Sequence, residues 1–67
     1  MTHADFLEWH KAMGYSYSTG AEALGVSRGT YANYVSGTSR TTGEPVEYKR
    51  VLALACAALK AGLPPVE

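Results

Sequence analysis

One short stretch, EALGVSRGTYANYVSG from Glu22 to Gly37, constrains the fold more than any other part of the chain. Gly25 can adopt the left-handed backbone conformation that ends a helix, and Ser27 is a preferred cap for the start of the next helix. Only Val26 lies between these two signals. The chain must therefore change direction sharply between two short helices.

The two helices beside this turn have their own start and stop signals. The earlier helix should begin after Ser16 or, as the alternative, after Thr19, which has Glu22 three residues later. The later helix should extend from Ser27 to Gly37. Its inward side chains should be those of three residues at helical spacing, Tyr31, Tyr34 and Val35.

Similar signals predict two further helices. The first helix should begin after Thr2, which with Asp5 forms a variant of the capping box, and should stop at Gly14. The last helix should span about residues 45–61, because a proline suits its first position. The sequence has no alternating strand pattern of useful length. We therefore expect residues 1–67 to form one compact all-α domain with four to five helices.

The turn around LGVS gives the two middle helices a definite crossing geometry. Ala21 is small, so the later helix can cross closely over the earlier one, and Val26 can fill the corner between them. Tyr31 and Tyr34 then anchor the later helix on its inner side. This arrangement, over about residues 17–36, is a helix-turn-helix motif, whose second helix can enter the major groove of DNA.

The stretch AEALGVSRGTYANYVSG, from Ala21 to Gly37, resembles the lambda-repressor-like (Cro/C1-type) helix-turn-helix family. It has that family's common pattern of a helix, then LGVSR, then a hydrophobic residue and a tyrosine three positions apart, then glycine. The family often has a phosphate-contacting glutamine where Tyr17 stands, and a bulky apolar residue where Gly20 stands. The resemblance implies a lambda-repressor-like fold and a DNA-binding transcriptional regulator. The small size and the ending ALACAALKAGLPP look similar to short phage-encoded regulators, including those associated with anti-CRISPR operons.

The charges are balanced in number but unevenly distributed along the chain. The formal net charge is +0, which taken alone argues against nucleic acid as a partner. No acidic residue occurs between Glu22 and Glu44, however, and that interval contains Arg28 and Arg40. The middle of the chain is thus a basic island, as expected for a surface that faces phosphate groups.

The outward side of the helix 27–36 carries four residues that are predicted to read bases, Arg28, Gly29, Ala32 and Asn33. Arg28 can bridge guanine O6 and N7 or clamp a phosphate, and Asn33 can bind adenine through two hydrogen bonds. Ala32 can meet a thymine methyl group, and Gly29 can bring the helix backbone close to DNA. The alternatives are a solvated arginine, a tolerated glycine near a helix start and an exposed asparagine with no role.

A second set of side chains, mostly hydroxyls, is predicted to contact the sugar-phosphate backbone of DNA. Its members are Tyr17, Ser18, Ser27, Thr30, Ser36, Thr38, Arg40 and Thr41. An ordinary polar loop would look similar over residues 38–42, except for Arg40. A phosphate contact by Arg40 would strengthen binding to all DNA sequences alike.

The segment VLALACAALK has no polar residue between Arg50 and Lys60, so every face of a helix there should need cover. One face can pack within the chain against Trp9, Leu24 and Tyr31. The other face is predicted to meet a second copy of the chain, because so small a domain supplies little core. The predicted dimer interface consists of Leu52, Cys56, Leu59, Leu63 and Val66. The alternative is a helix that is wholly buried within one chain.

Other functional classes find no support in the sequence. The start MTHADF lacks the features of a signal peptide, and the apolar run from Val51 to Leu59 is too short for a membrane span. Cys56 stands alone and is interpreted as a buried, reduced thiol of a cytosolic protein. His3 and His10 complete no zinc ligand set, and no phosphate loop, HExxH motif or activated nucleophile is present. We therefore expect no metal, no cofactor, no small-molecule ligand and no enzymatic activity.

Together these features predict a homodimer that binds double-stranded DNA and regulates transcription, as an autoregulatory repressor. It would read a palindromic operator through the helix 27–36, with half-sites about 34 Å apart. The alternative is a protein-binding module on the same scaffold, such as an antirepressor or a small phage inhibitor, and the zero net charge is its best support. The expected location is the cytoplasm of a bacterial cell or of a phage-infected host.

Overall fold

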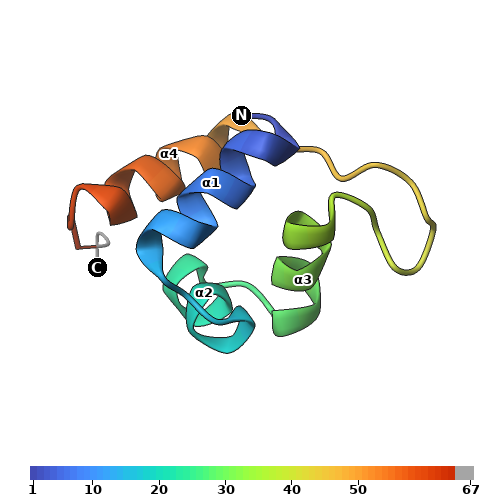
Figure 1. Ribbon diagram of the computed structural model, residues 1–67, viewed down its shortest axis with the longest axis horizontal. Helices are drawn as coiled ribbons and strands as arrows, with labels where there is room; N and C mark the ends of the chain where they lie inside the picture. Colours follow the sequence, from blue (N-terminus) through green and yellow to red (C-terminus); the bar gives the residue numbers. More distant parts are fainter. Residues whose placement is uncertain (65–67) are drawn as a thin grey trace.

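The computed structural model describes residues 1–64, and within that range the chain forms helices without strands (Figure 1). The helices are α1 (His3–Met13), α2 (Tyr17–Leu24), α3 (Arg28–Ser36) and α4 (Arg50–Lys60). α1 and α4 lie side by side, α2 and α3 pack beneath them, and the loop between α3 and α4 projects from one end. The expected compact all-α fold is confirmed.

The first helix begins and ends where the sequence predicts. The Asp5 N–H donates to Thr2 Oγ1 at 3.2 Å, and the Thr2 N–H donates to Asp5 Oδ2 at 3.0 Å, which completes the capping box. Hydrogen bonding to the Asp5 carboxylate, from the Thr2 backbone and then from the Thr2 side chain, lowers the pKa of Asp5. Gly14 ends the helix with a φ of 68°.

The second helix begins at the earlier of its two predicted starts. Ser16 is the cap, and Thr19 is its capping partner rather than a rival cap. The Ser16 N–H donates to Thr19 Oγ1 at 2.9 Å, and the Thr19 N–H donates to Ser16 Oγ at 3.1 Å. The helix closes at Gly25, which has a φ of 72°, and the Val26 N–H then donates to the Ala21 carbonyl at 3.0 Å. This closure creates the sharp turn that the sequence requires.

The third helix is likewise confirmed between its predicted signals. The Thr30 N–H donates to Ser27 Oγ at 3.1 Å, and Gly37 closes the helix with a φ of 85°. Tyr31 is fully buried, and Tyr34 and Val35 are partly buried against the core. The inner side of α3 is therefore the predicted one.

The core is small and largely aromatic. Its buried members are Phe6, Trp9, Ala21, Tyr31, Leu52 and Cys56. Phe6 lies at its centre, with its ring centroid 5.3 Å from that of Trp9 and 5.6 Å from that of Tyr31. Aromatic pairs of this kind contribute about 0.5–1.5 kcal/mol each beyond the burial of their area. The Trp9 indole N–H donates to the Cys56 carbonyl at 3.0 Å, which joins α1 to α4.

The glycine at position 20 has a structural explanation. A Cβ atom at this position would overlap the ring of Tyr31. The absent side chain lets the Tyr31 ring lie directly against α2, and the Tyr31 hydroxyl forms a 2.6 Å hydrogen bond with His10 Nδ1. Burial raises the pKa of Tyr31 to about 12, so the hydroxyl stays protonated at neutral pH. The Tyr31 ring of α3 thus fills the space beside Gly20 on α2.

The last helix begins at Arg50, and the prediction that it begins at Pro45 was wrong. Pro45 instead pairs with Thr38 in an isolated antiparallel bridge. The next residue, Val46, donates its N–H to the Gly37 carbonyl at 3.0 Å. Because the chain after Pro45 is bonded to the end of α3, it stays extended and cannot begin a helix there.

Two aromatic side chains complete the hydrogen bonding at the end of α3, where carbonyl groups lack helical partners. The Tyr48 hydroxyl donates to the Tyr34 carbonyl at 2.6 Å. His3 Nε2 lies 2.7 Å from the Val35 carbonyl, so this nitrogen must carry the proton. The packing of Tyr48 against Phe6, with centroids 5.9 Å apart, is a further reason why residues near 48 remain extended.

Candidate nucleic-acid interface

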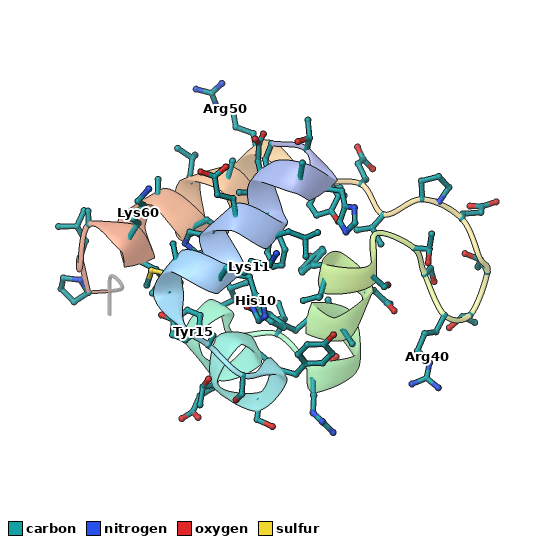
Figure 2. The ribbon with its side chains drawn as sticks, in the orientation of Figure 1. His10, Lys11, Tyr15, Arg40, Arg50 and Lys60 are labelled. Carbon is teal, nitrogen blue, oxygen red and sulfur yellow. The ribbon has the colours of Figure 1, made fainter. Side chains whose placement is uncertain are left out.

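Residues from separate segments come together around an open hollow of about 400 Å³ beside α3. It is lined by Tyr17, Arg28, Gly29, Ala32 and Arg40, and we refer to it as the α3 hollow. Tyr17 opens α2, the next three residues lie on α3, and Arg40 comes from the loop between α3 and α4. In Figure 2, Arg40 and Arg50 point to opposite sides of the molecule, so the basic side chains are not gathered on one face alone.

Three of the four predicted base-reading residues line the α3 hollow together. Arg28 is exposed at the first position of α3, and Ala32 lies one turn further along the same side. Gly29 between them is also exposed, and a Cβ atom added there would meet no other atom within 4 Å. The backbone of α3 is therefore open to close approach by a ligand at this point.

The electrostatic character of the α3 hollow is positive. Arg28 and Arg40 both contribute guanidinium groups, and residues 23–43 contain no acidic side chain. The free N–H groups at the start of α3 add a partial positive charge, and the Arg28 cation beside them does not neutralise it. Placing Arg28 there costs the helix about 0.3–1 kcal/mol. A hollow with these properties suits an anion.

Asn33 does not line the α3 hollow, although it was predicted to read bases. Its side chain is partly buried, and its Oδ1 accepts a hydrogen bond from the backbone N–H of Arg40 at 3.3 Å. A backbone N–H can only donate, so this bond fixes which end of the Asn33 amide faces the loop. Sequence reasoning missed this contact, because no local pattern connects a helix residue to a loop residue seven positions later.

The predicted DNA-backbone residues separate into two groups. Tyr17 and Arg40 line the α3 hollow, and Ser18 and Thr41 are exposed near them in sequence. The hydroxyls of Ser27, Thr30 and Ser36 are engaged within the chain, and Thr38 is bonded through its backbone. Ser27 Oγ donates to Thr30 Oγ1 at 2.9 Å, and Ser36 Oγ donates to the carbonyls of Asn33 and Thr38 at 3.2 and 3.0 Å. The first group is thus better placed than the second to meet a ligand.

The prediction that Leu52 and Cys56 form a dimer interface was wrong. Their side chains are 7% and 2% exposed, because this face of α4 packs against α1 and α2. Leu59 is partly buried against the same core, whereas Leu63 is 60% exposed. Val66, the remaining predicted interface residue, lies outside the described residues. The interior position of Cys56 raises the pKa of its thiol to about 11.

The opposite face of α4 is exposed, which also contradicts the alternative of a helix wholly buried in one chain. Val51 is 73% exposed and Leu54 is 58% exposed. An apolar groove of about 250 Å³ lies where α4 meets α2, and it is lined by Ala23, Leu24, Ala55, Ala58, Leu59, Leu63 and Pro64. Leu52, Cys56 and Leu59 share one side of the helix, so the packing of that side against the core leaves Val51 and Leu54 outside.

Residues 1–64 hold neither a metal-binding cluster nor a helix that could span a membrane. No group of three or more histidine, cysteine, aspartate or glutamate side chains that could hold a metal ion occurs in this range. Over the same residues, no helix has the length and apolar character needed to cross a bilayer.

Comparisons with protein-family models, with curated proteins and with solved structures returned no match to this chain. Its function is therefore inferred from its own sequence and geometry.

Proposed function

We propose that the protein binds double-stranded DNA sequence-specifically and represses transcription, with α2 and α3 acting as a helix-turn-helix motif of the lambda-repressor-like type. The observation that carries the proposal is the α3 hollow. Gly29 and Ala32 form its small side, and Arg28 and Arg40 supply its positive charge. A solvated helix face ordinarily carries acidic and basic side chains together, and this one carries no acid.

The major groove of DNA is about 12 Å wide and admits an α-helix, so α3 can lie in it with the hollow facing the bases. Small side chains at Gly29 and Ala32 bring the helix close to the base edges, and Arg28 is then within reach of guanine O6 and N7. Tyr17, at the start of α2, would face the adjacent phosphates. Occupancy of a promoter in this way is sufficient for repression and requires access to DNA in the cytoplasm of a bacterial cell or a phage-infected host.

A second copy is proposed to pack on the outer face of α4. Each copy presents the same helix, so two α4 helices can meet about a two-fold axis. Residues 51–59 carry no charge, and several are alanines, which permit close approach without like-charge repulsion. Burial of Val51 and Leu54 between the copies would remove their apolar side chains from water. Such a dimer would present two α3 helices to a palindromic operator.

The dimer is tested by sedimentation velocity on the wild-type chain and on Leu54→Lys. The wild type should sediment as a dimer, and Leu54→Lys should sediment as a monomer with unchanged helix content, because Leu54 is exposed in the single chain. A wild-type chain that remains monomeric at high concentration would contradict this part of the proposal.

DNA binding is tested by titrating a labelled duplex from the region upstream of the protein's own coding sequence, with an unrelated duplex as the control. Binding to the upstream duplex should be tighter, and the logarithm of the binding constant should fall linearly with the logarithm of the salt concentration. If the protein binds neither duplex at low salt, the proposal is rejected.

A protein-binding module, such as an antirepressor or a small phage inhibitor, is the second candidate. It is favoured by the net charge of +0 and by the apolar groove beside α4, which is separate from the α3 hollow. The DNA titration separates the two candidates, because a module of this kind would not show salt-dependent binding of the duplex.

A further inference from the structure

The loop between α3 and α4 has a defined shape although most of its residues are exposed. The Ser39 N–H donates to the Glu44 carbonyl at 2.8 Å, and the Gly43 N–H donates to the Ser39 carbonyl at 2.8 Å. The bridge between Thr38 and Pro45 closes the base of the loop. Arg40 is thus carried on a turn whose two ends are hydrogen-bonded to each other.

One further hydrogen bond ties this loop to α3. The Arg40 backbone N–H donates to Asn33 Oδ1 at 3.3 Å, so the loop is held against the helix at the residue that carries the guanidinium. Arg40 and Arg28 line the same hollow, one from the loop and one from the start of α3. The contact with Asn33 therefore holds the backbone from which the Arg40 guanidinium extends in a defined place beside α3.

We propose that Asn33 is a positioning residue that holds Arg40 in place to bind a phosphodiester group of the DNA backbone, rather than a residue that reads a base. The inference rests on the proposed DNA-binding function. It gives the second guanidinium of the α3 hollow a specific partner, a backbone phosphate beside the groove that α3 occupies.

Base reading by Asn33 conflicts with its observed hydrogen bond. Reading adenine requires both ends of the amide, with Oδ1 accepting from N6 and the NH₂ group donating to N7. Oδ1 faces the loop, where it accepts from the Arg40 N–H, and Asn33 is absent from the lining of the α3 hollow. A turn of the amide toward a base would break the bond and release the loop.

Prior ordering of the loop gives Arg40 an advantage in binding. A flexible loop loses conformational freedom when it binds, and this loss subtracts from the affinity. The bond to Asn33 removes part of that freedom in the free protein. The benefit should be equal for all DNA sequences, because a phosphate carries no sequence information.

The proposal is tested with Asn33→Ala, Arg40→Ala and the double variant, each titrated against the upstream duplex and an unrelated duplex. Asn33→Ala should weaken binding to both duplexes by the same factor, on the order of three- to tenfold, as expected for one backbone contact. It should have little further effect when Arg40 is already alanine, because it acts through Arg40. Thr42→Ser, a change on the same loop outside the α3 hollow that keeps the hydroxyl accepting from the Glu44 N–H, is the control and should leave both affinities unchanged.

The proposal would be overturned if Asn33→Ala lost the preference for the upstream duplex and lost it to the same extent when Arg40 is already alanine. Asn33 would then be restored as a base reader. Full additivity of the two single changes on both duplexes would overturn it as well.

A measurement without DNA keeps this inference separate from the proposed function. Amide hydrogen exchange of Arg40, followed by NMR, should be slow in the wild type and faster in Asn33→Ala. Asn33→Asp keeps an acceptor oxygen and should restore the protection of the Arg40 amide. Equally fast exchange in the wild type and Asn33→Ala would refute the positioning role even if the protein binds DNA. A protected Arg40 amide in a chain that binds no DNA would overturn the proposed function, and the phosphate role of Arg40 with it.

Discussion

The outer sides of α3 and α4 are both exposed and both lack acidic residues, yet they differ in what they present. The α3 hollow has small side chains between two arginines, whereas the outer face of α4 presents Val51 and Leu54 and no charge from residue 51 to residue 59. The first surface suits an anion that approaches a helix backbone closely, and the second suits an apolar partner. A surface without acidic residues therefore indicates a particular partner only when the side chains that remain on it define the chemistry of that partner.

The largest expected effect concerns the two faces of α4. Leu52→Ala should lower the free energy of unfolding by about 2–5 kcal/mol, because Leu52 is buried and its truncation leaves a cavity in a small core. Leu54→Ala is the matched control and should change the unfolding of the monomer by less than about 0.5 kcal/mol, as for other surface changes. Urea unfolding at low protein concentration measures both. Equal losses for the two variants would contradict the assignment of the inner and outer faces.

The next effect concerns the charged side of α3. Arg28→Ala should weaken binding to the upstream duplex by about 1–3 kcal/mol and reduce the preference over unrelated DNA, because a guanine contact is lost. Lys11→Ala removes the same charge from α1, outside the α3 hollow, and should leave that preference intact. Fluorescence anisotropy with both duplexes provides the comparison. If the two variants lowered the preference for the upstream duplex equally, Arg28 would contribute to binding only through its positive charge.

Gly29→Ala should have smaller effects than Arg28→Ala, and it should raise stability while it weakens DNA binding. An added Cβ atom meets no atom within 4 Å in the free protein, and alanine is favoured over glycine inside a helix by about 1 kcal/mol. The variant should therefore unfold at higher denaturant concentration while it binds DNA more weakly, since the methyl group separates α3 from the groove. Unchanged affinity in the more stable variant would show that DNA does not approach Gly29 closely.

The smallest effect is expected at mildly alkaline pH and concerns the interior beneath α4. Burial raises the pKa of Cys56 from 9.0 to about 11, so the thiol ionises in the unfolded chain before it ionises in the folded one. The free energy of unfolding should thus be constant at neutral pH and begin to fall as the pH rises above about 9. In Cys56→Ala this fall should start at higher pH, where Tyr31 titrates. Identical pH profiles for the two chains would place Cys56 outside the core.

The helix boundaries that depend on local chemistry could be predicted from the sequence. The caps at Thr2, Ser16 and Ser27 bind backbone groups only three residues away, so their effect is visible in the sequence itself. The start of α4 could not be predicted in this way. Pro45 suits a helix start locally, but its pairing with Thr38 depends on where α3 ends.

The candidate site, like the helix boundaries, could be predicted from the sequence only where it depends on local helical spacing. Arg28, Gly29 and Ala32 lie on one side of a helix, and their proximity follows from helical spacing alone. The role of Asn33 could not be inferred, because it depends on a loop that folds back onto α3. The assignment of Leu52 and Cys56 to a dimer interface failed for a related reason, since an apolar helix does not reveal which of its faces the remaining helices will cover.

The central claim is that the α3 hollow is the surface that meets DNA. NMR chemical-shift mapping, with the upstream duplex added to isotopically labelled protein, tests it most directly. The largest shifts should occur at the amides of Arg28, Gly29, Ala32 and Arg40, with the outer face of α4 unchanged by DNA once the dimer has formed. Shifts centred on Val51 and Leu54, with an unperturbed α3, would contradict the claim.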